Sequence, residues 1–195
     1  MKTKLALVLA AVLMLLISTA AIGSNMGFKI SIPLTAGWNN YVSLPYYNSY
    51  TNAASIFSDI TGCTLVSRWD NPTGLIQSWD GSRGINFAVT PGEAYIINVS
   101  ATTNWIVVGS HNPSLALTLT GNWNNYISIP YHTTATNAST LFSQIPNSTL
   151  VSRWDNSTGL IQSWDGSRGI NFTLTPGEGL IVNVSATGTW TPAHY

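Results

Sequence analysis

Short stretches of alternating apolar and polar residues run through the chain. Phe28, Ile30, Ile32 and Leu34 alternate with polar residues or proline, and residues 95–99 keep the same two-residue period. Such a period places successive side chains on opposite faces of a strand, so we predict half-buried β-strands. Turn-forming dipeptides separate them, namely Asp80-Gly81, Pro91-Gly92, Asp165-Gly166 and Pro176-Gly177. Short strands with frequent turns are typical of a β-sandwich or barrel.

This pattern occurs twice, at an offset of 85 residues. Residues 65–87 (LVSRWDNPTGLIQSWDGSRGINF) return at 150–172 with one change, Pro72 to Ser157, and the alignment extends from Leu34 onward. We therefore predict an all-β protein of two tandem homologous β-sandwich or barrel-like modules. Module 1 is expected over 24–109, including an N-terminal strand, and module 2 over 110–195. A repeated unit favours a structural or binding role over catalysis.

One short segment in each module has helical spacing instead. Ala53, Ile56, Phe57 and Ile60 recur at three- and four-residue intervals, behind polar residues that commonly cap helices. The same spacing returns over 138–145. The sequence thus predicts one short helix per module, packed on one face or at an open end of the sheet.

The first residues have the layout of a secretory signal peptide. Two lysines precede an apolar run over 5–17, and the small residues Ala20, Ala21 and Gly23 follow. We predict a signal peptide over 1–23 and a protein that is secreted or held at the cell surface. A retained membrane anchor is the weaker alternative, because the apolar run is short for a full span. No later stretch could span a membrane.

Charged residues are scarce, at 7% of the chain. After residue 23 there are five basic and seven acidic residues and no basic patch, so nucleic acid and anionic membranes are not expected partners. Most of these charges recur in both modules, which predicts a local set of structural ion pairs. The predicted set is Arg68, Asp70, Asp80, Arg83 and Glu93 with their equivalents Arg153, Asp155, Asp165, Arg168 and Glu178. A surface with so little charge permits close packing of many copies.

Cys63 is the only cysteine, and its repeat equivalent is Ser148. No intrachain disulfide is therefore available, although small secreted domains often depend on one. An interchain bridge is conceivable, but a small half-buried residue is the favoured interpretation. Stability must come from aromatic packing, from docking of the modules or from assembly.

Three segments of each module resemble a known type of repeat. The segments GWNNYVSLP (37–45), SRWD (67–70) and TPGEAYIINV (90–99) are similar to repeat modules of secreted archaeal and bacterial cell-surface proteins, in which a GWN-SLP strand opens the unit and a PGEGY-like strand closes it. Module 2 carries the same segments, with Asn122 in place of Gly37. This resemblance implies cell-envelope material and β architecture more than a particular activity.

Candidate catalytic groups are few. Asp70 with Asp80, and Asp155 with Asp165, are carboxylate pairs of the kind used in glycoside hydrolysis. However, each begins a turn, where an aspartate commonly bonds to its own backbone. The turns lack the D-x-D-x-D spacing of a calcium loop, so a calcium site built from both turns stays an open alternative.

The remaining chemistry-bearing residues give no motif. His111, His132 and His194 lack the spacing of a metal site, and none recurs in the other module. No G-x-S-x-G elbow marks a nucleophile. We expect no enzyme activity, no cofactor and no metal.

Several N-x-[ST] sequons make glycosylation a candidate modification. Asn147 and Asn156 lie in turn-like polar stretches and are the preferred sites, whereas Asn171 abuts an alternating strand and is expected to be inaccessible. The complete set is Asn98, Asn137, Asn147, Asn156, Asn171 and Asn183.

The first function hypothesis is a secreted structural subunit that self-assembles with other copies into an extracellular filament, sheath or surface layer. Residues 25–34, with Phe28, Ile30, Ile32 and Leu34 on one face, could add to the sheet edge of the next subunit. In the alternative, these residues form the first strand of their own module.

The second hypothesis is a surface adhesin that binds carbohydrate. Aromatic side chains near Asn, Asp and Arg can stack on sugars, and two modules would give avidity for cell-surface glycans. The candidates are Trp69, Trp79, Trp154 and Trp164. Packing of these side chains in the core is the competing interpretation.

Overall fold

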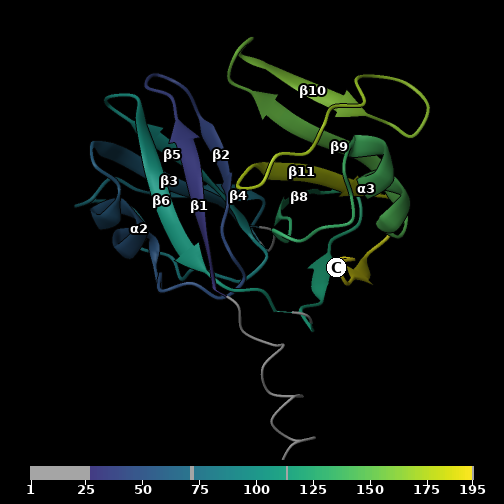
Figure 1. Ribbon diagram of the computed structural model, residues 1–195, viewed down its shortest axis with the longest axis horizontal. Helices are drawn as coiled ribbons and strands as arrows, with labels where there is room; N and C mark the ends of the chain where they lie inside the picture. Colours follow the sequence, from purple (N-terminus) through teal and green to yellow (C-terminus); the bar gives the residue numbers. More distant parts are fainter. Residues whose placement is uncertain (1–26, 71–72, 113, 195) are drawn as a thin grey trace, which may run out of the picture.

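The fold is taken from a computed structural model that describes residues 27–70, 73–112 and 114–194. The predicted signal peptide lies outside the described residues. Module 1 contains β1 (Phe28–Leu34), β2 (Asn40–Ser43), α2 (Ala53–Asp59), β3 (Cys63–Asp70), β4 (Leu75–Trp79), β5 (Ala94–Val99) and β6 (Thr103–Gly109) (Figure 1). Module 2 contains β7 (Leu117–Leu119), β8 (Asn124–Ser128), α3 (Ala138–Gln144), β9 (Ser148–Asp155), β10 (Leu160–Trp164), β11 (Gly179–Val184) and β12 (Gly188–Trp190).

Both modules have the same strand order. A four-stranded antiparallel sheet has the order β2-β5-β3-β4 in module 1 and β8-β11-β9-β10 in module 2. A two-stranded ribbon completes each module, β1 with β6 and β7 with β12. The predictions of an all-β fold and of one short helix per module are confirmed.

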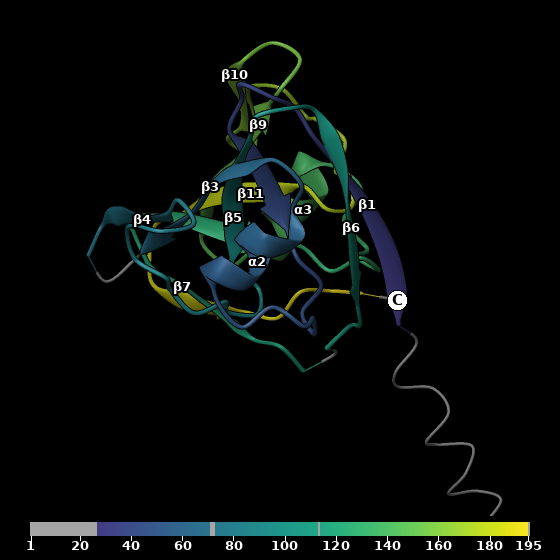
Figure 2. The same ribbon diagram turned by 90° about the vertical axis from the view of Figure 1, so that its left-hand side faces the viewer.

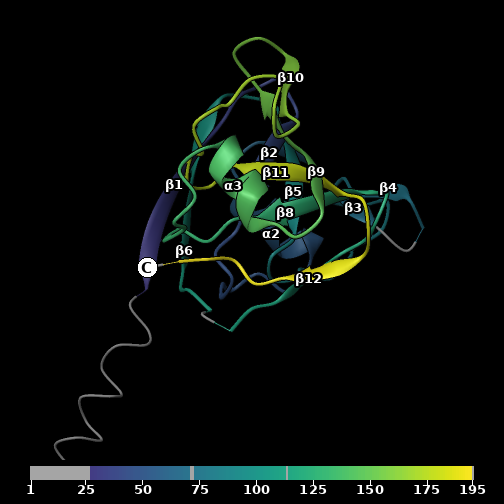
Figure 3. The ribbon, with the colours of Figure 1, turned by 90° about the vertical axis from the view of Figure 1, so that its right-hand side faces the viewer.

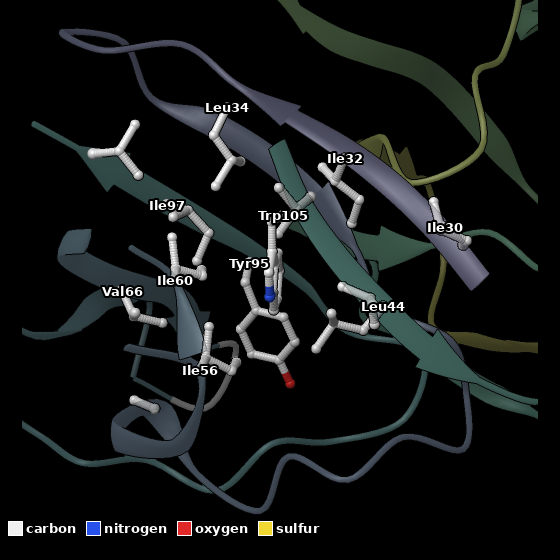
Figure 4. Close-up of a cluster of buried hydrophobic side chains, with 14 of the residues drawn as sticks. Ile30, Ile32, Leu34, Leu44, Ile56, Ile60, Val66, Tyr95, Ile97 and Trp105 are labelled. Carbon is white, nitrogen blue, oxygen red and sulfur yellow. The ribbon is translucent and has the colours of Figure 1, made fainter. Parts of the chain in front are cut away.

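Each module encloses its own apolar core. In module 1 the inward side chains of β1 and β6 pack on those of β5, and Ile56 of α2 closes the cluster (Figure 4). Tyr95 and Ile97 are fully buried there. In module 2 the equivalent positions are Leu180 and Val182, also fully buried. In β1 the alternation seen in the sequence is therefore the alternation between core and solvent, whereas β5 is buried on both faces.

The N-terminal strand belongs to its own module in this chain. β1 is antiparallel to β6 over seven residue pairs, from Phe28 opposite Gly109 to Leu34 opposite Thr103. The equivalent ribbon of module 2 has only three pairs. β12 ends two residues before Pro192, and the equivalent residue of module 1 is Val107. The ribbon of module 2 is shorter because proline cannot donate a backbone hydrogen bond to a neighbouring strand.

Each helix begins just after the polar residues that were expected to cap it. Asn52 accepts a hydrogen bond from the backbone of Ser55, and the Ser55 hydroxyl receives one from the backbone of Asn52, which is a capping box. Asn137 and Thr140 repeat this arrangement. Within the described part of the chain, no helix has both the length and the apolar character to cross a membrane.

Candidate functional site: the module boundary and the two hairpins

The two modules dock through reciprocal backbone contacts. The Ser43 amide donates to the Gly177 carbonyl at 2.8 Å, and the equivalent Ser128 amide donates to the Gly92 carbonyl at 2.8 Å. In each module the first strand of the four-stranded sheet, β2 or β8, thus donates a hydrogen bond to the Pro-Gly turn of the other module. The contact has approximate two-fold symmetry, which a duplicated sequence makes available because equivalent residues can meet equivalent partners.

Two buried serines join the modules at the centre of this contact. Ser43 Oγ accepts from the Ile129 amide at 3.1 Å, and Ser128 Oγ accepts from the Leu44 amide at 3.1 Å. Ser128 Oγ also donates to the Glu93 carbonyl at 2.8 Å. A buried hydroxyl is costly unless it is hydrogen-bonded, and these hydroxyls are satisfied only when the modules are docked. The hydrogen bonds of these two serines therefore favour this one docked arrangement of the modules.

Aromatic side chains cover the docking face. Trp69 of module 1 stacks on Tyr126 of module 2 with ring centroids 5.8 Å apart, and Trp154 of module 2 stacks on Tyr41 of module 1 at 6.2 Å. The two tyrosines stack on each other at 5.8 Å. These rings bury apolar area that would otherwise face water, which is the main favourable contribution to docking.

The four tryptophans proposed for sugar stacking divide into two pairs. Trp69 and Trp154 lie at the module boundary, where tyrosine covers one face of each ring. Trp79 and Trp164 pack against the cores of their own modules. Only the first pair therefore lies where a ligand could approach both modules.

A cleft adjoins each of these boundary tryptophans. The first cleft, of about 350 Å³, lies among Trp69, Glu93 and Tyr126, and the second, of about 210 Å³, lies among Tyr41, Trp154 and Glu178. Residues from both modules line each cleft, so both clefts exist only in the docked molecule. Asn156 also lines the second cleft and donates to Asn40 Oδ1 at 2.9 Å.

An arginine in each module pairs with the glutamate that lines its cleft. Arg68 lies 3.6 Å from Asp70 Oδ1 and 3.4 Å from Glu93 Oε2, and Arg153 lies 3.7 Å from Glu178 Oε1. The two guanidinium groups also lie over aromatic rings, 5.1 Å and 4.8 Å from the ring centroids of Phe87 and Phe172. These contacts fix the long arginine side chains against the sheet.

The other expected ion pairs are not formed. Asp80 Oδ1 accepts from the backbone amides of Ser82 at 2.9 Å and Arg83 at 2.6 Å, and Asp165 makes the equivalent bonds. These amides lower the pKa of both aspartates. Among the described residues, no carboxylate lies within 4.0 Å of the side chain of Arg83 or Arg168. The prediction of ion pairs was wrong here because the turn backbone satisfies the aspartates.

Asp155 also bonds within its own turn. It accepts from the Ser157 hydroxyl at 2.7 Å and from the Ser157 amide at 3.0 Å, which lowers its pKa. The carboxylates proposed for catalysis or calcium binding are thus occupied as turn acceptors or arginine partners. No group of three or more His, Cys, Asp or Glu side chains in the described segments is arranged to hold a metal ion.

Glu178 is an unusual carboxylate because it is largely buried. Burial raises its pKa to about 7, although the charge of Arg153 opposes this shift. Burial also raises the pKa of the equivalent Glu93, whereas Arg68 and the Tyr95 hydroxyl act to lower it. Each cleft therefore contains a carboxyl group whose pKa is raised by burial, an effect that the charge of its arginine opposes.

The raised pKa of Glu178 predicts that Glu178→Gln stabilises the protein at pH 8. The folded protein binds a proton at Glu178 more readily than the unfolded chain, so the charged carboxylate costs stability as the pH rises from about 4.5 to 7. Glutamine resembles the protonated acid and removes this cost, which is at most about 3 kcal/mol. Urea unfolding should show the gain at pH 8 and none at pH 4. Glu93→Gln should change stability in the same direction, because burial raises the pKa of Glu93 as well. An equal effect of Glu178→Gln at both pH values would contradict the prediction.

The β3-β4 and β9-β10 hairpins, with the segment that follows each, carry the most exposed apolar residues that both modules share. Leu75, Ile76 and Ile85 are 64%, 53% and 53% exposed, and their equivalents Leu160, Ile161 and Ile170 are 65%, 54% and 53% exposed. We refer to these two groups as the hairpin patches. Buried positions have meanwhile changed between modules, as Ile56 to Leu141 shows. Within the repeated segment 65–87 the exposed apolar residues are identical in both modules, and so are the buried residues Val66 and Phe87 with their equivalents Val151 and Phe172.

The three histidines meet in space, which their sequence spacing did not indicate. The ring centroid of His111 lies 4.1 Å from that of His194 and 6.5 Å from that of His132. The Phe28 ring also contacts His132, with centroids 5.9 Å apart. Burial, together with the other two histidines, lowers the pKa of His111. The cluster packs the intermodule linker, the loop after β8 and the C-terminal segment together.

The sequons differ in accessibility from what the sequence predicted. Asn147 is exposed in a turn, as expected, but Asn156 is half-buried and its amide nitrogen is already a donor to Asn40. Asn171 is exposed, in an irregular segment between β10 and β11. Asn98 and Asn183 use their amide nitrogens to bond Asn39 and Asn124, and Asn137 caps α3.

Cys63 is half-buried, and its thiol lies 3.7 Å from the Leu65 carbonyl oxygen. Burial raises its pKa to about 11, so the thiol stays protonated near neutral pH. Because the thiolate is the reactive form, this position is poorly suited to an interchain disulfide.

Neither a family model, nor a curated protein, nor a solved structure matches this chain. Its function is therefore inferred from the module boundary and the hairpin patches.

Proposed function

We propose that the protein is a secreted structural subunit that self-assembles into an extracellular filament, sheath or surface layer. The observation that carries this proposal is the presence of two identical, exposed hairpin patches on one chain. Exposed apolar groups of this kind mark interaction surfaces, and two per molecule allow each copy to bind two others. The low charge of the chain and its resemblance to cell-surface repeat modules support the same conclusion.

Assembly by donation of the N-terminal strand is less favoured than assembly through the hairpin patches. β1 already pairs with β6 along its full length, and its inward residues Ile32 and Leu34 are buried in the core of module 1. Donation to another copy would expose this core unless a second strand replaced β1. The hairpin patches need no such rearrangement.

Electron microscopy and sedimentation velocity of the protein without residues 1–23 test this proposal. At neutral pH and rising protein concentration, we expect regular filaments or sheets, because burial of apolar patches drives association. The polymer should persist in 1 M NaCl, since few charges are available for salt to screen. A monomer at all concentrations would contradict the structural function.

A carbohydrate-binding adhesin is the second candidate, and the second cleft is the observation that favours it. Tyr41, Trp154, Arg153 and Asn156 combine aromatic walls with polar groups in a space of about 210 Å³. This combination suits a neutral sugar, which presents apolar faces and hydroxyl groups. A monomeric protein that binds neutral oligosaccharides, and loses binding when Asn156 is changed, would favour this function over assembly.

A further inference from the structure

Each hairpin patch continues the face through which the modules dock. Ile76 lies opposite Trp69 in the β3-β4 pairing, so the two side chains share a face of the sheet. The bond between the Ser67 and Ser78 hydroxyls, 2.7 Å long, confirms which residues share that face. Trp69 is covered by Tyr126 of module 2, whereas Ile76 lies farther out and is exposed. Ile76 is thus a part of the docking face that the other module leaves uncovered, whereas its neighbour Leu75 points to the opposite face of the strand.

The outer edge of β4 is also open at Ile76. The Ile85 amide donates to the Ser78 carbonyl at 2.8 Å, so the backbone of Ser78 faces away from β3. Backbone direction alternates along a strand, and therefore the amide and carbonyl of Ile76 face the same outer edge. Ile170 and Ser163 make the equivalent bond in module 2 and leave Ile161 in the same position. Both edges can receive a strand.

A second copy of this chain fits such an edge better than an unrelated partner. Two identical edges related by a two-fold axis run antiparallel, which is the geometry in which one residue pair exchanges two backbone hydrogen bonds. The two edges have the same sequence, Leu-Ile-Gln-Ser-Trp, so either edge can meet either edge of another copy. The charges beside each edge, Asp80 and Arg83 in module 1, are opposite in sign, so two edges meet without net repulsion.

The positions of the two edges favour an open chain of molecules. The β4 hairpin projects from one side of the body and the β10 hairpin from another (Figures 2 and 3). Because β4 and β10 are the outer strands of separate sheets, they do not pair with each other within one chain. Each molecule therefore has two free edges that point in different directions.

We propose that copies of this chain join edge to edge through β4 and β10, by antiparallel pairing centred on Ile76 and Ile161 and by burial of the hairpin patches. This inference rests on the proposed function of assembly, and it names the surface through which assembly occurs.

Variants with one altered edge test the inference most sharply. A lysine on an exposed edge opposes strand pairing and disfavours burial of the patch. Ile76→Lys leaves the β10 edge intact, so two molecules can still pair but no third can join, and sedimentation velocity should show dimers. Ile161→Lys should give the same result. The double variant Ile76→Lys/Ile161→Lys should be monomeric.

Val108→Lys is the matched control, because Val108 is 63% exposed and lies on β6, outside both hairpins. This variant should form polymers as the unaltered protein does. Circular dichroism should show the same fold in all variants, since the altered side chains are exposed.

The possible results test the proposed contact surface separately from the proposed structural function. Polymers of the double variant would overturn the proposed surface and leave the structural function standing. Loss of polymers in Val108→Lys would also overturn it, because the contact would then extend beyond the hairpins. A monomeric unaltered protein would overturn both proposals together.

Discussion

Gly179→Ala is expected to destabilise the protein by about 1–3 kcal/mol, although alanine occupies the equivalent position 94. A methyl group on Gly179 would lie 2.9 Å from the Ala94 methyl and 2.9 Å from the Val42 carbonyl oxygen. Both neighbours belong to module 1, and the carbonyl is backbone that cannot rotate away. The module boundary accordingly has room for one methyl group at this point and not for two.

Urea unfolding with a reciprocal exchange measures this effect. Ala94→Gly combined with Gly179→Ala should recover the share of the loss that comes from contact between the two methyl groups. Gly188→Ala is the matched control, because the nearest atom to its added methyl lies 3.9 Å away. It should change the free energy of unfolding little or raise it slightly. A Gly179→Ala variant as stable as the parent would show that the modules dock less closely than described.

Ile56→Ala and Leu141→Ala should each lower the free energy of unfolding by about 2–5 kcal/mol. These residues are equivalent positions on α2 and α3, and both are fully buried in the core of their module. Truncation to alanine removes apolar contacts and leaves a cavity that the surrounding sheet cannot fill.

Each of these variants should still unfold in a single transition. Because Ser43 and Ser128 lose buried hydrogen bonds when the modules separate, loss of one module exposes the docking face of the other. Calorimetry should therefore show one peak, moved to lower temperature. Two peaks, one of them at the original temperature, would mean that the modules are stable independently.

Local features of this protein could be read from residues that are close in sequence. The two-residue period of 28–34 predicted β1, and the spacing behind Asn52 predicted α2, because a strand or helix places neighbours on defined faces. The turns at Asp80 and Asp165 followed from the affinity of an aspartate for its own turn backbone. The same affinity explains why Arg83 and Arg168 lack the predicted ion pairs.

The candidate site could be predicted only in part. The repeat indicated which residues would be equivalent, but not that Trp69 and Trp154 would face the other module while Trp79 and Trp164 entered their own cores. All four have similar surroundings in sequence. Their separation depends on which face of each sheet is covered, and that follows from docking.

By itself, the sequence determined the all-β class, the duplication, the positions of strands, helices and turns, and the scarcity of charge. Only the tertiary structure decided the reciprocal docking of the modules, the exposure of Ile76 and Ile161, and the meeting of His111 with His194. The physical reason is distance along the chain. Period and turn chemistry depend on neighbours a few residues apart, whereas docking depends on contacts between residues 35 to 116 positions apart, for which no local pattern exists.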